Sequence, residues 1–222
     1  FKPETIKAIE EVKWIPEWGE ERIKNMVNMR SDWCISRQRR WGVPIPILYC
    51  EDCGKVIVND KTIKAISDMF RKESSDSWYS KDPSEFIPAD VKCECGCGKF
   101  RKEMDIFDVW FDSGAMPYAQ IHYPFENKEL LDSHQVYPAD FIAEGVDQTR
   151  GWFFTLHAIA SMVFDTISYK AVISNGLVLD KNGNKMSKRL GNGVDPFSTI
   201  EKYGSDPLRW YMITNSSPWD NL

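Results

Sequence analysis

The sequence lacks several features that would assign it to a broad class at once. No run of about 18 apolar residues occurs, so we expect no membrane-spanning helix. The first residues show no basic stretch followed by an apolar one, so we expect no secretory signal. There is no internal repeat, no low-complexity tract and no initial Met. We therefore expect ordinary folded domains cut from a longer chain.

An excess of basic charge is also absent. The 222 residues include 28 Lys and Arg against 33 Asp and Glu, which gives a net charge of −5. This excludes a generally basic nucleic-acid coat, so any contact with nucleic acid would need local basic patches. The length suits one large α/β domain, or one domain plus a small insert.

The cysteines are clustered. Cys50 and Cys53 form a C-x-x-C motif, and Cys93, Cys95 and Cys97 form a C-x-C-x-C motif. Disulfide frameworks belong mostly to small secreted domains, so this grouping favours a bound metal. Four thiolates would form a closed, structural zinc site.

The choice of zinc ligands stays open at one point. We take Cys50, Cys53, Cys93 and Cys95 as the candidate set, with Cys97 as an alternative to either of the last two. Reduced thiols without a metal are the other interpretation. Cys34 stands alone in the sequence and is expected to be a core thiol.

Three regions follow one another along the chain. Residues 1–48 are expected to form a helical lead-in, and residues 49–104 a small zinc-bearing insert with a strand at 55–58 and a helix at 61–72. From residue 105 onward, strands and helices alternate, which predicts an α/β fold with a parallel sheet and crossover helices. The expected strands cover 106–111, 140–143 and 170–179, and the expected helices cover 149–164, 196–203 and 207–213.

Two lysines follow a turn signal at residues 181–184. Lys185 and Lys188 lie three residues apart and could reach one polyanion together. Lysines are flexible point charges that suit phosphate groups, and stabilising charge on a leaving phosphate is an electrostatic task of this kind. A solvated basic surface is the alternative interpretation.

A polar segment lies between an expected strand and an expected helix. It contains Glu144, Gly145, Asp147 and Gln148. The carboxyl ends of sheet strands are where α/β proteins bind ligands, and these side chains could hold an ammonium group, hydroxyls or a ribose. Capping of the helix by Asp147 is the alternative.

Two tryptophans lie near glycines. Trp110 precedes Gly114, and Trp152 follows Gly151. The two indole rings could form the walls of a small apolar pocket. Plain aromatic packing in a core explains the same pattern.

Four strings together resemble the isoleucyl branch of the class I aminoacyl-tRNA synthetase family. The short one, Lys-Met-Ser-Lys-Arg at 185–189, resembles the loop that defines the class. The longer strings at 31–42, 108–114 and 144–153 narrow the resemblance to the isoleucyl branch.

The resemblance implies a fold and an activity. Residues 105–214 would be the second half of a Rossmann-type catalytic core, residues 1–48 a lead-in from the editing-domain junction, and residues 215–222 the start of an anticodon-binding helical domain. The enzyme would activate isoleucine with ATP and transfer it to tRNA(Ile). The resemblance further implies a cytoplasmic enzyme that is monomeric at full length and does not bind membranes.

The resemblance also implies roles for individual residues. Lys185 and Lys188 would be catalytic and would bind the ATP phosphates together with magnesium. Two further groups would hold the aminoacyl-adenylate, namely the polar residues Glu144, Gly145, Asp147 and Gln148 and, around the isoleucine side chain, Trp110 and Trp152. The cysteine region would match a zinc-bearing insert that some members carry.

One motif of the family is missing. None of the three histidines is followed by x-Gly-His, the ATP motif that should lie upstream. We therefore expect this chain to be inactive alone. The alternative is a zinc-bearing tRNA- or nucleotide-binding module without catalysis.

Overall fold

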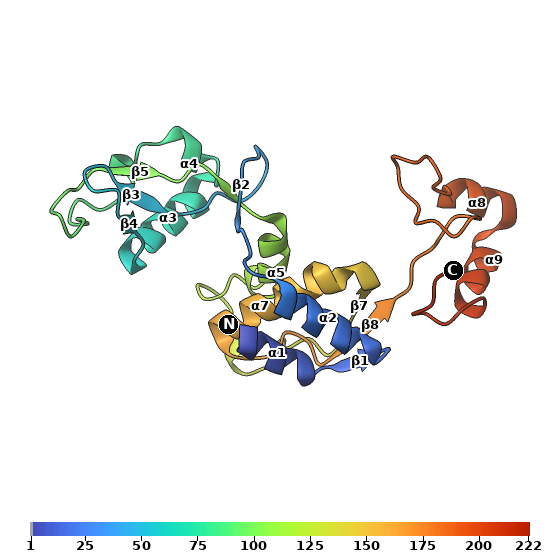
Figure 1. Cartoon of the computed structure of the whole chain (residues 1–222). Coiled ribbons are helices and arrows are strands. Elements are labelled where there is room, and N and C mark those ends of the chain that lie inside the picture. The colour runs from blue at the N-terminus through green and yellow to red at the C-terminus, as the bar shows by residue number, and fades with distance from the viewer. Residues whose placement is uncertain (1) are drawn as a thin grey trace. The chain divides into compact units, whose positions relative to one another are not determined.

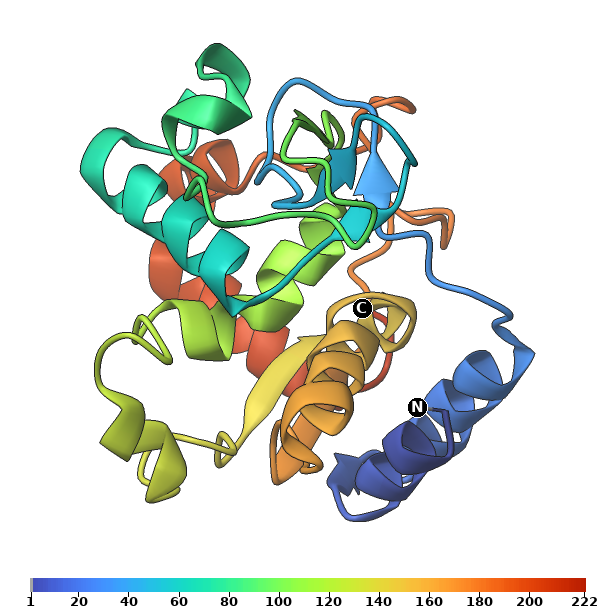
Figure 2. The ribbon, with the colours of Figure 1, turned by 90° about the vertical axis from the view of Figure 1, so that its left-hand side faces the viewer.

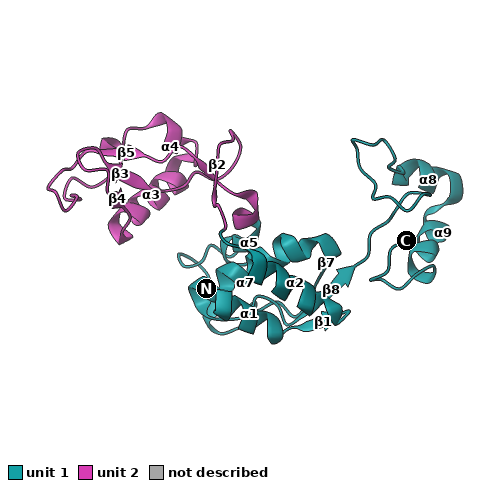
Figure 3. Ribbon diagram, in the orientation of Figure 1, with its two compact units in different colours: residues 1–32, 113–222 teal, residues 33–112 magenta. Residues whose placement is uncertain are grey.

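The computed structural model describes residues 2–222. The chain divides into two compact units, residues 33–112 and residues 1–32 with 113–222 (Figure 3). Within residues 2–222, no helix is both long enough and apolar enough to span a bilayer.

The larger unit is built on a parallel sheet with the strand order β1-β8-β7 (Figure 1). The strands are β1 (Lys13–Ile15), β7 (Ile142–Gly145) and β8 (Ala171–Asn175), and helix α7 (Trp152–Phe164) joins β7 to β8. A helical crossover between adjacent parallel strands is the unit from which α/β folds are made. The predicted fold class is therefore confirmed.

The centre of this sheet lies against an aromatic core. Val172 on β8 pairs with Trp14 on one side and with Ile142 on the other. The Trp14 ring meets Phe153 and Tyr169 edge-on, with centroids 6.3 Å away in each case. Val172, Trp14, Phe153 and Tyr169 are all buried, and burial of such rings contributes much of the packing free energy of a core.

Helices complete the larger unit. Helices α1, α2 and α7 pack together, and α1 and α2 lie side by side (Figure 2). The remaining helical elements of this unit include α5, whose first residues belong to the smaller unit. The bounds are α1 Lys2–Glu10, α2 Trp18–Met29, α5 Val109–Ala119, α6 Lys128–Asp132, the 3₁₀ helix η2 Val146–Arg150, α8 Pro196–Tyr203 and α9 Ser205–Thr214.

The smaller unit is antiparallel. Its sheet has the order β4-β3-β5, and a separate ribbon pairs β2 with β6. The strands are β2 Ser36–Arg37, β3 Leu48–Cys50, β4 Val56–Ile57, β5 Phe100–Lys102 and β6 Ile106–Phe107. The helices are α3 Asp60–Glu73, α4 Ser77–Ser80 and the 3₁₀ helix η1 Pro83–Glu85.

Trp78 fills the core of the smaller unit. It is fully buried, and its rings lie 6.2 Å from Phe70 and 6.1 Å from Phe86. Its Nε1 donates a hydrogen bond of 2.7 Å to the carbonyl oxygen of Glu103. A buried indole N–H needs such a partner, so this bond removes the main cost of burying Trp78.

Two secondary-structure predictions need correction. The strand expected over 106–111 ends at Phe107, because helix α5 begins at Val109. Its apolar residues are not spaced at helical intervals, and so the pattern favoured a strand. Strand β7 occupies 142–145 instead of 140–143. The short strand β1 was not predicted.

His157 connects the core to the pH dependence of stability. It is completely buried, its Nδ1 accepts a hydrogen bond of 3.4 Å from the Ser168 N–H, and burial lowers its pKa to about 3. The unfolded chain binds a proton at this residue below pH about 6.5, whereas the folded chain does not. The contribution of neutral His157 to the free energy of unfolding is therefore complete above pH about 6.5, and it is lost as the pH falls towards 3.

We expect His157→Asn to reduce this acid sensitivity, because Asn can still accept the Ser168 N–H but does not titrate. In urea unfolding between pH 7 and pH 4, the free energy of unfolding should fall more steeply with pH in wild type than in His157→Asn. The difference between the two slopes should approach about 1.4 kcal/mol per pH unit. His134→Asn is the matched control, since His134 is exposed and its φ of 57° suits Asn. Equal slopes in wild type and His157→Asn would contradict the prediction.

Candidate functional site

Four cysteines of the smaller unit meet at one point. Cys50 ends β3, Cys53 follows in the next turn, and Cys93 and Cys95 come from the loop before β5. Their sulfur atoms all lie within 4.8 Å of one another. The Cys50–Cys95 and Cys53–Cys93 distances are 3.6 and 3.4 Å. Four thiols from two chain segments at this spacing could hold a metal ion.

The backbone around this cluster favours the metal-binding form of one thiol. A backbone hydrogen bond from Cys53, with a second from Asp52, lowers the pKa of Cys50 to about 6. The thiolate is the form that binds metals, and donor N–H groups stabilise it. The effect is confined to Cys50, because hydrogen bonds with neighbouring thiols raise the pKa of Cys53 and of Cys95.

Cys97 and Cys34 lie outside the cluster. The Cys97 sulfur accepts a hydrogen bond of 3.3 Å from the Lys99 N–H and is not among the four clustered sulfurs. Cys34 is exposed, so the prediction that it is a core thiol is wrong. Its segment runs along the surface of the smaller unit, which the spacing of cysteines could not indicate.

The carboxyl edge of the parallel sheet carries the second group of predicted residues. Glu144 and Gly145 end β7, and η2 follows at once. A Cβ atom on Gly145 would lie 2.6 Å from Asp147 Oδ1, so a larger residue would displace that carboxylate. Buried Thr149 donates to the Val146 carbonyl at 2.9 Å and accepts from Arg22 Nε at 3.2 Å, which ties η2 to α2.

Gln148, not Asp147, caps the following helix. Gln148 Oε1 accepts a hydrogen bond of 3.0 Å from the N–H of Trp152, the first residue of α7. This bond satisfies one of the donors that every helix start leaves unpaired. The Asp147 carboxylate is half exposed and faces Lys185 instead. The capping role considered for Asp147 is therefore wrong.

Trp152 is held by its ring nitrogen. Its Nε1 donates a hydrogen bond of 3.1 Å to the carbonyl oxygen of Ser113 on α5. That carbonyl is available because Pro117, four residues later in the helix, has no N–H to donate to it. Gly114 also matters here, since a Cβ atom on it would lie 2.9 Å from the Thr155 carbonyl.

A carboxylate and an amide shape the loop that carries the two lysines. Asp180 Oδ1 accepts the N–H groups of Asn182 and Asn184, each at 2.9 Å, and Asp180 Oδ2 accepts Asn192 Nδ2 at 2.9 Å. Asn192 Oδ1 in turn accepts the Ser187 N–H at 2.9 Å. Asp180 and Asn192 were not among the predicted site residues, although Asp and Asn beside a glycine turn are typical loop-forming residues.

The structure brings one of the lysines to the predicted acidic segment. Lys185 Nζ lies 3.8 Å from Asp147 Oδ2. The Lys185 side chain is 62% exposed and the Asp147 side chain 50%. Lys188 is exposed on the same loop. Both segments leave the carboxyl edge of the sheet, where α/β proteins place their ligands.

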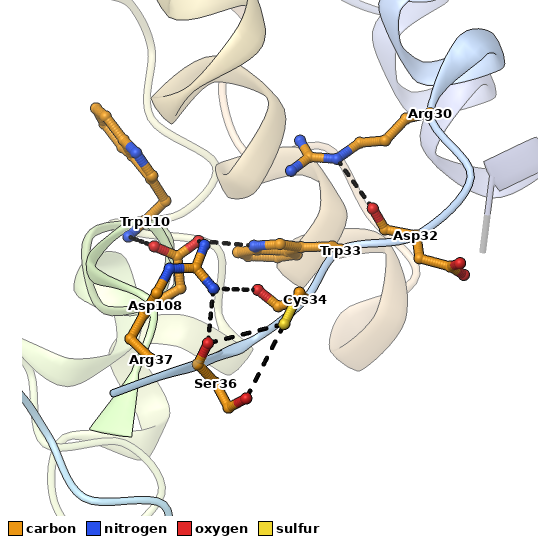
Figure 4. Close-up of polar contacts among 8 residues, drawn as sticks. All are labelled: Arg30, Asp32, Trp33, Cys34, Ser36, Arg37, Asp108 and Trp110. Atoms are coloured by element: carbon orange, nitrogen blue, oxygen red, sulfur yellow. Dashed lines mark hydrogen bonds and ion pairs between the residues drawn. The ribbon is translucent and has the colours of Figure 1, made fainter. Parts of the chain in front are cut away.

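Trp110 lies in the smaller unit, at the start of α5. Its N–H donates a hydrogen bond of 3.4 Å to Asp108 Oδ1 (Figure 4), and the residue is 40% exposed. Asp108 is buried and is paired with Arg37 at 3.0 Å. Asp108 was not among the predicted site residues, because it lay inside the strand expected over 106–111 and not before a helix.

The sequence and the fold together place the chain in one family. The sequence matches the family described as tRNA synthetases class I (I, L, M and V) over residues 1–222. The chain belongs to this family.

Its curated relatives are isoleucine–tRNA ligases. The protein from Bacteroides fragilis is 57% identical over 100% of this chain, and that from Porphyromonas gingivalis is 51% identical over 100% of it. The protein from Caldanaerobacter subterraneus is 50% identical over 96%. The chain spans only 21 or 22% of the length of these relatives. The predicted resemblance is confirmed.

Solved structures share the fold. LeuRS of Agrobacterium radiobacter K84, in a ternary complex with tRNA and LeuAMS, has a TM-score of 0.59 at 24% identity, over 87% of this chain and 26% of that one. Mycobacterium tuberculosis methionyl-tRNA synthetase, bound by methionyl-adenylate, has a TM-score of 0.58 at 18% identity, over 98% and 32% of the two chains. These likenesses support the synthetase fold of the chain.

The cysteine cluster leads to a prediction about metal content. We expect the purified chain to hold about one thiolate-bound metal ion, measured by elemental analysis of the folded protein. Cys95→Ser should lose most of it because it removes a clustered ligand. Cys97→Ser, the matched control, should keep it. Folded wild-type protein without metal, or equal loss in both variants, would contradict the assignment.

Proposed function

We propose that this chain is a segment of an isoleucine–tRNA ligase, which joins isoleucine to tRNA(Ile) by way of isoleucyl-adenylate. The observation that carries the proposal is the pairing of Lys185 with Asp147 at the carboxyl edge of the sheet, at 3.8 Å. Identity of 57% to the Bacteroides fragilis isoleucine–tRNA ligase over the whole chain supports the choice of amino acid.

In the first step, an oxygen of the isoleucine carboxylate attacks the α-phosphorus of ATP. The new oxygen–phosphorus bond forms as the bond to the β-phosphate oxygen breaks, and pyrophosphate leaves. Such a transfer needs positioning and neutralisation of charge more than an acid or a base. Lys185 and Lys188 are the cations we assign to the departing phosphates, because they share one exposed loop.

The second group of residues would hold the intermediate. We assign Glu144, Gly145, Asp147 and Gln148 to the isoleucyl-adenylate, and Trp110 and Trp152 to the isoleucine side chain. A ribose or ammonium group suits a carboxylate at the end of β7, and indole rings suit a branched apolar side chain. In the second step a hydroxyl group of the tRNA attacks the acyl carbon, and AMP leaves.

Two metals belong to this proposal. Magnesium with ATP would neutralise phosphate charge. The four clustered cysteines fit zinc, because tetrahedral Zn–S bonds of about 2.3 Å place sulfur atoms about 3.8 Å apart. The observed distances of 3.4 and 3.6 Å are close to that value. With four protein ligands the zinc would be structural.

The remaining assignments rest on the family resemblance. We propose that residues 1–48 lead in from an editing domain, that 49–104 form the zinc-bearing insert, that 105–214 are the second half of the catalytic core, and that 215–222 begin an anticodon-binding domain. We also propose a cytoplasmic, monomeric full-length enzyme.

A catalytic role of Lys188 can be measured by isoleucine-dependent ATP–pyrophosphate exchange in the full-length ligase. Lys188→Ala should lower the rate about 100-fold, since it removes one stabilising charge from the leaving group. The KM for isoleucine should change little. Lys181→Ala, in the same loop, is the control and should act like wild type. An unchanged rate in Lys188→Ala would refute the role.

The second candidate function is a tRNA- or nucleotide-binding module without catalysis. It rests on the cysteine cluster and on the exposed loop of Lys185 and Lys188, which a binding module could also use. The same exchange assay separates the two. A full-length protein that is folded and binds tRNA, yet shows no isoleucine-dependent exchange, would support the module.

A further inference from the structure

Asp108 is a buried carboxylate that receives two side chains from a distant segment (Figure 4). Its Oδ2 accepts a hydrogen bond of 2.8 Å from Trp33 Nε1 and lies 3.0 Å from the Arg37 guanidinium. Its side chain is only 5% exposed. A carboxylate this far from water is stable only when it is paired and hydrogen-bonded, so these contacts determine where it lies.

Arg37 is itself held in place. Its Nη1 donates to the carbonyl oxygens of Cys34 and Ser36, at 2.6 and 2.8 Å. Both bonds are drawn in Figure 4. A guanidinium with several fixed acceptors loses little further freedom when it binds a carboxylate. The segment that contains Trp33 and Arg37 therefore acts as a rigid clamp on Asp108.

The same aspartate begins helix α5. Its Oδ1 accepts the Trp110 N–H at 3.4 Å, and its carbonyl oxygen accepts the Phe111 N–H at 2.8 Å. The N–H of Asp108 donates a hydrogen bond of 2.7 Å to the carbonyl oxygen of Ile35. An aspartate in this position satisfies donors of the first turn and stabilises the helix start. The first turn of α5 must follow any movement of Asp108.

Trp110 is the residue whose position this arrangement controls. It is the second residue of α5, and its ring points away from the Asp108 cluster (Figure 4). With 40% of its surface exposed, it can meet a ligand. Helix α5 also contains Gly114 and Pro117, which weaken a helix intrinsically. The anchored first turn therefore fixes the backbone from which the ring projects.

We propose that Asp108, clamped by Trp33 and Arg37, is a positioning residue that sets the Trp110 ring and thereby the affinity of the enzyme for the amino-acid side chain. The inference rests on the proposed function, in which Trp110 contacts isoleucine. It adds three residues that do not themselves touch the substrate.

The test uses exchange kinetics in the full-length ligase. Asp108→Ala should raise the KM for isoleucine about tenfold, since small displacements of a binding group have large effects. Trp33→Phe keeps an aromatic ring but removes the donor, and should raise that KM by a smaller factor. The KM for ATP should stay within about twofold in both, as expected for a local change in one pocket.

Asp105→Asn is the matched control. Asp105 is also a carboxylate bonded across the same ribbon, since its Oδ2 accepts Gln38 Nε2 at 2.7 Å. It makes no bond to α5 among the contacts of residues 2–222. The KM for isoleucine and the KM for ATP of Asp105→Asn should therefore match those of the wild-type enzyme. An equal rise in the KM for isoleucine in Asp105→Asn would overturn the specific role of Asp108.

A double-mutant cycle separates positioning from general stability. If Asp108 acts through Trp110, Asp108→Ala should add little to the KM for isoleucine once Trp110→Ala is present. The Trp33→Phe and Trp110→Ala pair gives the same comparison should Asp108→Ala fail to fold. Additive effects would overturn the proposal, because a structural defect does not need Trp110.

The outcomes distinguish the inference from the function on which it rests. Wild-type enzyme without isoleucine-dependent exchange would overturn the proposed function and this inference with it. Active wild-type enzyme, with an unchanged KM for isoleucine in the Asp108 and Trp33 variants, would overturn this inference alone.

Discussion

The parallel pairing of β7 with β8 is the constraint on which the site in the larger unit depends. Glu144 pairs with Ser174 and Gly145 with Asn175, so both strands end at one edge of the sheet. The acidic segment follows one strand and the lysine loop follows the other. A slip of one residue would move every side chain of a strand to the opposite face. The shared edge places the segments that carry Lys185 and Asp147 next to each other.

The four clustered cysteines of the smaller unit are held in place in two different ways. Cys50 and Cys93 are buried members of the core around Trp78, whereas Cys53 and Cys95 are exposed. Two of the four sulfurs are thus placed by packing and two by the turns that follow them. A core of this kind can hold two ligands in place before a metal binds, which reduces the ordering that binding requires.

The sequence allowed much of this to be predicted. Alternating strands and helices indicated the parallel sheet, and the spacing of Cys50, Cys53, Cys93 and Cys95 indicated the cluster. Each is marked by short motifs, although the two cysteine motifs themselves are about forty residues apart. The start of α5 was not predictable in this way, because its first turn is stabilised by Asp108 and thus by residues about 75 positions earlier, as the contact to Trp33 shows. The cap of α7 by Gln148 was missed because a 3₁₀ helix intervenes.

The residues that shape the lysine loop were also hidden. Asp180 and Asn192 are twelve positions apart, and neither belongs to a helix or a strand. Hydrogen bonds from Asn192 and from loop N–H groups lower the pKa of Asp180. Its carboxylate is therefore ionised and able to accept bonds at neutral pH. Turn propensity indicates that such residues form a loop, but it does not indicate which of them will bond across it.

The ion pair between Lys185 and Asp147 has a consequence for how the loop would respond to an anion. Pairs as exposed as this one contribute about 0–1 kcal/mol, and salt screens them. The ammonium group of Lys185 is therefore bound only weakly to the carboxylate of Asp147. A more highly charged anion at the edge of the sheet would replace Asp147 as the partner of Lys185, while the backbone of the loop stays in place. Asp147 would then serve as a resting counter-charge, and the lysine would exchange one anion for another.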